Sequence, residues 1–239
     1  MKLAIMQPYL FPYLGYFQLI AAVDKFVIYD DVAFIKQGWV NRNRILLHGK
    51  PHLFSLPLQG ASSNKIIRDT LVSIHEYPRW KDKFLKTVAL AYSKAPYFEP
   101  TRSLLSDIFD SNFGDIGELA KRSVLAVCQR LGLTTRIEQS STFYGNGHLH
   151  AQDRVLDICA REGATTYINA PGGRELYSSE TFTAHGIGLR FLRSRMPAYP
   201  QFEHGFVPAL SIIDVLMFNT PRQINLLLNQ CDLISKEDY

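Results

Sequence analysis

The stretch KLAIMQPYLFPYLGYFQLI, residues 2–20, decides the fold class, because its hydrophobic pattern changes partway along. Residues 2–6 are a short apolar run, which predicts a buried strand. Apolar residues within 12–23 then recur at helical spacing and predict a helix. A second apolar run, residues 26–30, follows and predicts another buried strand. Strand, helix and strand in this order predict the start of a parallel α/β sheet.

The chain after these elements continues the alternation around a long helical segment. Residues 42–58, RNRILLHGKPHLFSLPL, predict a β-hairpin that turns at HGKP. Residues 78–131 have a helical pattern, and we expect breaks at Pro96, Pro100 and Gly114. A strand, a helix, a strand, a helix, a strand and two helices are then expected, in this order, over residues 134–139, 152–163, 165–170, 178–186, 188–192, 210–219 and 221–230.

The length and the composition fit one large domain. The chain has 239 residues, of which 46% are apolar and 20% charged, as in ordinary soluble globular proteins. We therefore expect a single α/β domain over residues 1–239, with a Rossmann-like, largely parallel sheet and helices on both faces. Residues 78–131 are expected to be a helical insertion or cap within it.

The charge and the cysteines predict the cellular setting and the kind of ligand. A net charge of +4 without a Lys/Arg run favours small anionic molecules over nucleic acid. No apolar run is long enough for membrane insertion, and Gln7, Pro8 and Pro12 interrupt the apolar start, which argues against a signal peptide. Three distant cysteines, Cys128, Cys159 and Cys231, indicate a reducing cytoplasm. The oligomeric state stays open.

Polar residues stand where the first two predicted strands end. Ligands of parallel α/β sheets bind just outside the carboxyl ends of the strands, which places Gln7, Asp30 and Asp31 in a candidate site. Either aspartate could act as a general base or hold a metal-bound phosphate. Asp also suits a turn or a helix cap, so a purely structural role is the alternative.

A cationic, amide-rich segment follows the second strand. It contains Lys36, Trp39, Asn41, Arg42 and Asn43. Lysine and arginine hold phosphates and carboxylates, and the two amides suit sugar hydroxyls or a carbonyl. The alternative is a solvated polar loop at the start of an edge strand. We expect this segment to bind substrate.

Two later segments supply further candidates. Asn169 ends the predicted strand 165–170, and Gly172 and Gly173 after it would allow a ligand close to the backbone, although a tight turn needs the same residues. Asp214 lies in an apolar helix, where an acid is costly unless it is paired or faces a polar cavity. We expect either a salt bridge to an arginine or the orientation of a ligand-binding cation. The first segment also contains Arg174, and the second also contains Asn219. A candidate lid with Tyr199, Gln201 and His204 precedes the second segment. The arginines considered for a salt bridge to Asp214 are Arg42 and Arg44.

Metal binding and thiol chemistry receive less support. His148 and His150 form an H-x-H pair with Asp153 close behind, but a clear third and fourth ligand are missing, so we expect no metal site. Cys159 lies on the apolar side of a predicted helix, and we expect it in the core.

Four blocks of this sequence together resemble the WbqC-like protein family. They are QPYLFPYLGYF (7–17), DDVAFIKQGWVNRNRI (30–45), TYINAPGGRELY (166–177) and FVPALSIIDVLMFN (206–219), so the resemblance covers essentially the whole chain. The family is associated with bacterial surface-polysaccharide (O-antigen-type) and related biosynthetic gene clusters. The resemblance implies a role in modifying an activated sugar or another small metabolite.

The first strand and helix are also similar to those of nucleotidylyltransferases and pantothenate synthetases, which share the HUP-type fold. Those enzymes carry a His-x-Gly-His-like turn, whose imidazoles and helix N-terminus stabilise nucleotide phosphates. Here Gly15 is kept, while Tyr16 replaces the second histidine and Tyr13 lies near the first. Gly15 and Tyr16 are therefore expected to bind substrate. Tyrosine carries no positive charge near neutral pH, which disfavours nucleotidyl transfer but leaves nucleotide binding open.

The leading expectation is a transferase that moves an acyl or aminoacyl group onto an amino-sugar nucleotide or a similar phosphorylated precursor. Lys36, Arg42 and the helix start near Gly15 would hold phosphate, and Asp30 or Asp31 would be the base. The donor, a nucleotide or an acyl or aminoacyl carrier, is not specified by the sequence. The alternatives are an ATP-dependent ligase or nucleotidylyltransferase-like enzyme, and a non-catalytic binding or assembly protein of the same pathway.

Overall fold

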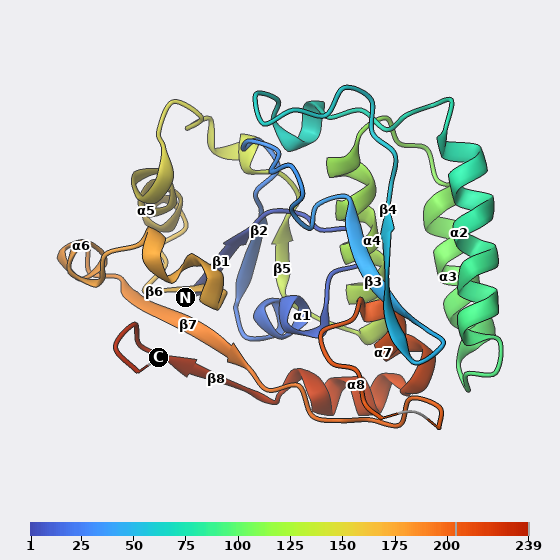
Figure 1. Ribbon diagram of the computed structural model, residues 1–239. Helices are drawn as coiled ribbons and strands as arrows, with labels where there is room; N and C mark the ends of the chain where they lie inside the picture. The colour runs from blue at the N-terminus through green and yellow to red at the C-terminus, as the bar shows by residue number, and fades with distance from the viewer. Residues whose placement is uncertain (204, 239) are drawn as a thin grey trace.

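A six-stranded sheet with the order β5-β2-β1-β6-β7-β8 forms the centre of the molecule (Figure 1). The computed structural model describes residues 1–203 and 205–238. The strands are β1 (Lys2–Met6), β2 (Lys25–Ile28), β5 (Arg136–Glu138), β6 (Thr166–Asn169), β7 (Gly188–Ser194) and β8 (Cys231–Ile234). The first five are parallel, as predicted, whereas β8 pairs antiparallel with β7 and was not predicted.

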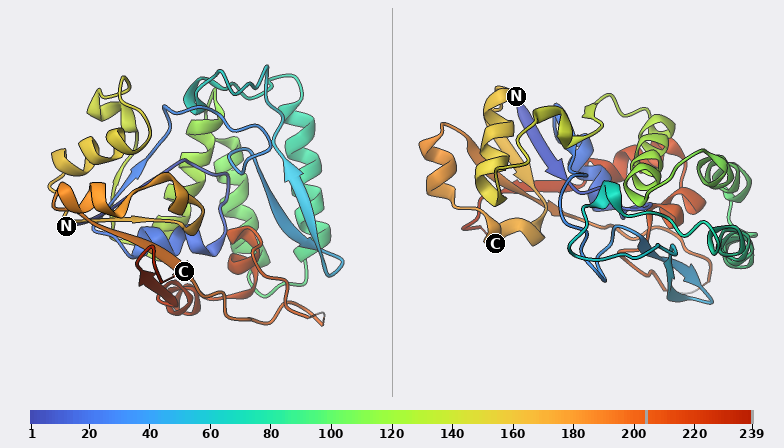
Figure 2. Two further views of the ribbon diagram at one scale, coloured as in Figure 1. Left: turned by 60° about the vertical axis from the view of Figure 1, so that its left-hand side comes forward. Right: turned by 90° about the horizontal axis from the view of Figure 1, so that it is seen from above.

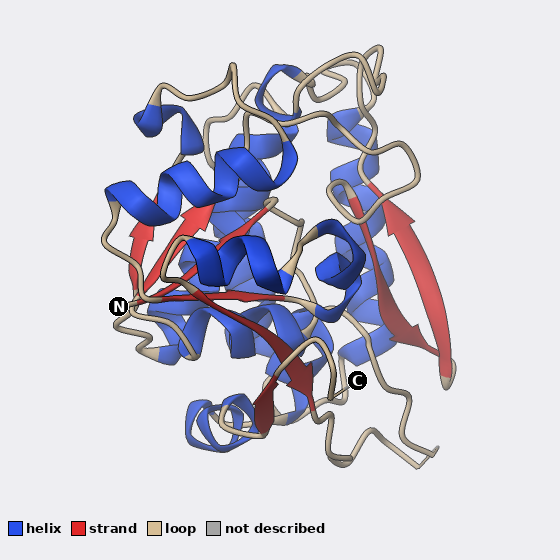
Figure 3. Ribbon diagram, turned by 90° about the vertical axis from the view of Figure 1, so that its left-hand side faces the viewer, coloured by secondary structure: helices blue, strands red, loops and turns tan. Residues whose placement is uncertain are grey.

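Helices cover both faces of this sheet because alternate residues of its central strands point in opposite directions. Ile5 and Val27 join one apolar cluster with residues of α5 and α6, and Ala4 and Phe26 join a larger cluster with residues of α1, α4 and α8. Figure 3 shows helices in front of and behind the strands. The bounds are α1 (Leu14–Ala21), α4 (Ile116–Leu131), α5 (Ala151–Arg161), α6 (Ser179–Ala184) and α8 (Pro221–Leu228).

The predicted helical segment forms α2 (Tyr77–Tyr92), α3 (Phe98–Asp110) and α4. Pro96 and Gly114 lie between these helices, as predicted. The break predicted at Pro100 is wrong, because Pro100 lies in the first turn of α3. A helix has no internal partner for its first N–H groups, so a proline there removes no hydrogen bond.

The predicted hairpin forms a separate two-stranded sheet, β3 (Arg42–Leu47) and β4 (Lys50–Ser55). His48 and Gly49 connect the strands, both with positive φ, as a tight hairpin turn requires. The hairpin packs on α2, where the rings of Phe54 and Phe84 lie 4.6 Å apart. Seen from above in Figure 2, α2 and α3 lie at one end of the molecule and α5 and α6 at the other.

The remaining elements are short. They are η1 (Ile67–Asp69), η2 (Ser141–Tyr144), η3 (Pro171–Leu176) and α7 (Ile212–Phe218). Among the described residues, no helix combines the length and the apolar character needed to cross a membrane.

Candidate functional site

The carboxyl edge of the sheet brings the first group of predicted site residues together. The chain places β2 on one side of β1 and β6 on the other, so the segments that follow β1 and β6 diverge. Gln7 follows β1, Asp30 and Asp31 follow β2, and Asn169 ends β6. Open α/β sheets bind ligands where the strand order reverses in this way.

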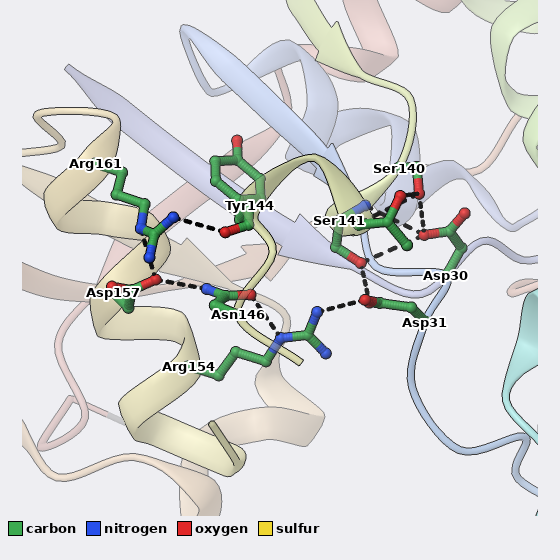
Figure 4. A network of polar contacts seen from close by, with 10 residues as sticks. Asp30, Asp31, Ser140, Ser141, Tyr144, Asn146, Arg154, Asp157 and Arg161 are labelled. Atoms are coloured by element: carbon green, nitrogen blue, oxygen red, sulfur yellow. Dashed lines mark hydrogen bonds and ion pairs between the residues drawn. The ribbon is translucent and has the colours of Figure 1, made fainter. Parts of the chain in front are cut away.

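The two aspartates after β2 have different surroundings (Figure 4). Oδ1 of Asp30 accepts hydrogen bonds from Ser140 Oγ at 2.8 Å and from Ser141 N at 3.2 Å, whereas its Oδ2 accepts none from a described residue. Both oxygens of Asp31 are engaged, one by the Ser141 hydroxyl and the other by Arg154 Nη2 at 2.6 Å. Asp30 therefore keeps one oxygen for another partner, and Asp31 does not.

Arg154 organises this network and was not among the residues predicted from the sequence. It comes from α5, and only 4% of its side chain is exposed. The guanidinium lies 4.9 Å from the ring centre of Tyr29, and Nε donates to Asn146 Oδ1 at 3.0 Å. An arginine beside Val155 on the buried side of a helix was the signal that could have revealed it.

The amides of the cationic segment hold the backbone in place. Asn41 donates to the carbonyl of Leu56 at 2.9 Å, and Asn43 donates to the carbonyl of Phe11 at 2.7 Å. Lys36 is exposed and forms no ion pair with a described residue. The two asparagines thus shape the segment, and the cations are the groups left for an anion.

Arg42 and Arg44, at alternate positions of β3, both lie against Trp39. Their guanidinium carbons are 5.7 Å and 4.9 Å from the indole centre. Arg42 also donates from Nε to the carbonyl of Gly38 at 2.8 Å. A cavity of about 170 Å³ opens here; its lining includes Tyr9, Pro12, Tyr13, Trp39, Asn43 and Arg44.

Asp214 forms no salt bridge to Arg42 or Arg44, so that expectation is wrong. Its Oδ2 accepts from Tyr92 Oη at 2.8 Å, and its Oδ1 accepts from Tyr199 Oη at 2.7 Å and Gln201 Nε2 at 2.5 Å. Burial raises the pKa of Asp214, and the three hydrogen bonds oppose that rise. The neutral donors take the place of an arginine.

The segment around Tyr199 is therefore held down by Asp214. Gln201 also bonds Val207 in both directions, with its Oε1 accepting from Val207 N at 2.7 Å. His204, which was predicted as part of the same lid, lies outside the described residues.

Several other predicted binding residues are enclosed by the protein. Tyr16 is 1% exposed, and its hydroxyl donates to the Gln7 carbonyl at 2.9 Å. Asn219 is buried and donates to the Val215 carbonyl at 3.0 Å. A Cβ on Gly15 would collide with the Tyr13 ring, so glycine is required by packing at this position. These contacts give all three residues structural roles.

The two glycines after β6 differ in how much space surrounds them. A Cβ on Gly173 would lie 2.6 Å from Asn169 Nδ2, whereas nothing lies within 4 Å of one on Gly172. Asn169 is 5% exposed, and its Oδ1 accepts from Ala170 N at 2.7 Å. A side chain at position 173 would collide with Asn169, so packing requires glycine there, whereas the space beside Gly172 is open.

The residues considered for metal binding and thiol chemistry are His148, His150 and Cys159. His150 is the N-cap of α5 and does not lie on a strand. Within residues 1–203 and 205–238, no group of three or more His, Cys, Asp or Glu side chains is arranged to hold a metal ion. Cys159 is fully buried, as predicted, and burial raises its thiol pKa to about 12.

Comparison with known proteins identifies the family. The model of the WbqC-like protein family matches residues 7–226. An uncharacterized protein of Mycobacterium tuberculosis, Rv1507c, is 32% identical over 235 residues, which are 96% of this chain and 98% of the relative. No solved structure matches the chain. The chain belongs to the WbqC-like protein family.

Proposed function

We propose that this protein is a cytoplasmic transferase of bacterial surface-polysaccharide or related biosynthesis. It transfers an acyl or aminoacyl group to the amino group of an amino-sugar nucleotide or a similar phosphorylated precursor. Family membership supports the biosynthetic setting through the resemblance noted above. The observation that carries the proposal is the free Oδ2 of Asp30 at the carboxyl edge of the sheet.

The strand order supports a finer fold assignment. The five parallel strands β5-β2-β1-β6-β7 are arranged as in the doubly wound order 3-2-1-4-5 of nucleotide-binding folds. We therefore assign the sheet to the Rossmann-like, HUP-type architecture. In that architecture the crevice between the segments after β1 and β6 holds the substrate, beside Gln7 and Asn169.

The proposed reaction uses Asp30 as the general base and Asp31 as a positioning residue. With a thioester donor, the acceptor nitrogen attacks the carbonyl carbon, so a C–N bond forms and the C–S bond breaks. Asp30 takes the proton that the nitrogen loses, and this proton then passes to the departing thiolate. Lys36, which has no acidic partner among the described residues, supplies positive charge for the phosphates.

The test is product formation from amino-sugar nucleotides and acyl-coenzyme A donors, followed by mass spectrometry. Asp30→Asn keeps the oxygen that accepts from Ser140 and Ser141 but cannot take a proton. We expect it to lower kcat by about 100-fold or more while substrate binding persists. Asp107→Asn, at an exposed position of α3, is the matched control.

Two results would contradict this proposal. Full activity of Asp30→Asn would remove Asp30 as the base. ATP consumption with pyrophosphate release, and no acyl transfer, would favour a ligase instead.

A further inference from the structure

Arg44 is a cation without an anionic partner in the described part of the chain. Its guanidinium forms no hydrogen bond or ion pair with any described residue, and its only side-chain partner is the Trp39 ring. The Nε atom is buried and unsatisfied, one of three such side-chain atoms in the described part of the chain. A buried donor without an acceptor is costly, and such sites in proteins call for a ligand or another explanation.

The surroundings of Arg44 complete a binding pocket. Trp39, 38% exposed, and Tyr9 present aromatic surface to the cavity, and its described lining residues include no acid. The Tyr9 hydroxyl has no hydrogen-bond partner among the described residues. Burial, and to a smaller extent Tyr13, raise the pKa of Tyr9, so its hydroxyl stays protonated as a donor.

The walls of this pocket are fixed by hydrogen bonds between three distant segments. Ser211 N donates to the Arg44 carbonyl at 2.8 Å, and Ile212 N donates to the Pro12 carbonyl at 2.8 Å. Ser211 Oγ also donates to the Phe11 carbonyl at 2.7 Å. The pocket is therefore preorganised, so binding there does not have to order the backbone first.

We propose that the pocket of Tyr9, Trp39 and Arg44 binds an oxyanion carried on a sugar ring. The Arg44 guanidinium donates to oxygens of the phosphate or carboxylate, and the sugar ring lies on the aromatic surface. The volume of about 170 Å³ is below that of sites for whole drug-sized ligands, so it suits this one end of a larger substrate.

This inference deepens the proposed function by naming the charged part of its substrate, and rests on it for the choice of a sugar. Acyl transfer is not needed to test it, however. If the anion binds through Arg44 and no acyl transfer occurs, the inference holds and the reaction proposed above fails. If acyl transfer occurs and Arg44 has no effect on binding, the inference fails alone.

The experiment measures binding of four probes: a hexose phosphate, the corresponding hexuronic acid, the neutral hexose and inorganic phosphate. The tryptophans are Trp39 and Trp80, so the fluorescence of a Trp80→Phe protein reports on the pocket itself. In this background Arg44→Gln is compared with Arg79→Gln. Arg79 is an exposed arginine of α2 without an ion pair to a described residue, so both variants lose the same charge.

We expect at least one charged sugar to bind more tightly than the neutral hexose and inorganic phosphate. Arg44→Gln should weaken that binding by about tenfold or more, and Arg79→Gln should leave it unchanged. Preference for the phosphate or for the uronic acid tells which oxyanion the pocket takes. Two results with the protein that keeps Arg44 would overturn the inference: neither charged sugar binds, or the neutral hexose binds equally well. Equal affinity of Arg44→Gln and the unsubstituted protein overturns it as well.

Discussion

Asp214 is a buried carboxylate that is stabilised by hydrogen bonds from neutral donors. Removing the carboxylate with Asp214→Ala leaves the hydroxyls of Tyr92 and Tyr199 and the amide of Gln201 without their acceptor. We expect the free energy of unfolding to fall by about 3 kcal/mol or more. Asp214→Asn keeps an oxygen for Tyr199 and Gln201 and should cost only about 1 kcal/mol. Urea denaturation of both variants checks this, and equal losses would contradict it.

The same residue predicts a pH dependence. Burial raises the folded-state pKa of Asp214 above its ordinary value of 3.8, so the folded state holds this proton more tightly than the unfolded state. Its contribution to stability is complete below pH 3.8 and is lost as the pH rises through the folded pKa.

Asp214→Asn lacks this titration, so the stability advantage of the natural protein over it should shrink as the pH rises in that window. Urea denaturation of both proteins at successive pH values measures the difference, in which the other titrating groups cancel. An advantage that grows with pH would show that the carboxylate is stabilised as an anion instead.

At the level of elements, Arg154 connects α5 to the segment after β2. Arg154→Met would leave Asp31 as a largely buried charge without its cation. We expect a loss of about 3 to 5 kcal/mol in the free energy of unfolding. Adding Asp31→Asn removes the unpaired charge and should restore part of the loss, as a double-mutant cycle would measure. If the second substitution adds its own full cost, the two side chains act independently.

The end of α4 allows a matched test of backbone conformation. Gly132 follows α4 with φ 66°, and Gly114 precedes the helix without a positive φ. A Cβ would meet nothing within 4 Å at either position. Gly132→Ala should therefore cost about 1 kcal/mol from its left-handed conformation alone, whereas Gly114→Ala should be neutral or slightly stabilising. Thermal denaturation checks both, and equal effects would be contrary to this explanation.

At the scale of the whole molecule, the helical segment and the sheet share one apolar cluster. Residues of α2, α3 and α4, including Phe84, Leu105 and Val124, belong to the same cluster as Ala4 and Phe26 of the central strands. The segment 78–131 is therefore predicted to unfold together with the rest of the domain and not as an independent unit.

The two tryptophans make this prediction measurable, because Trp80 lies in α2 and Trp39 lies beside β3. We expect the urea transitions of Trp39→Phe and Trp80→Phe, followed by fluorescence, to coincide with the loss of helical circular dichroism in each variant. Separate transitions for the two reporters would show that the helical segment unfolds on its own.

Local patterns predicted most elements because strands and helices with one buried face have a period that the sequence carries. The sheet from residue 2 onward, the helical stretch with breaks at Pro96 and Gly114, and the buried Cys159 were all predicted in this way. β8 was not, because its four residues carry no clear period.

For the candidate site, the sequence alone determined the residue types at the strand ends: acids after β2, and cations and amides before and within β3. Only the tertiary structure decided which of these side chains have hydrogen-bond or ion-pair partners within the protein. It engages both oxygens of Asp31 and gives Asp214 neutral donors. Among the described residues, it provides no donor for one oxygen of Asp30 and no acceptor for the Arg44 guanidinium. The physical reason is that hydrogen-bond partners and burial depend on residues distant in the chain, such as Arg154 and Tyr92, whose approach no local pattern records.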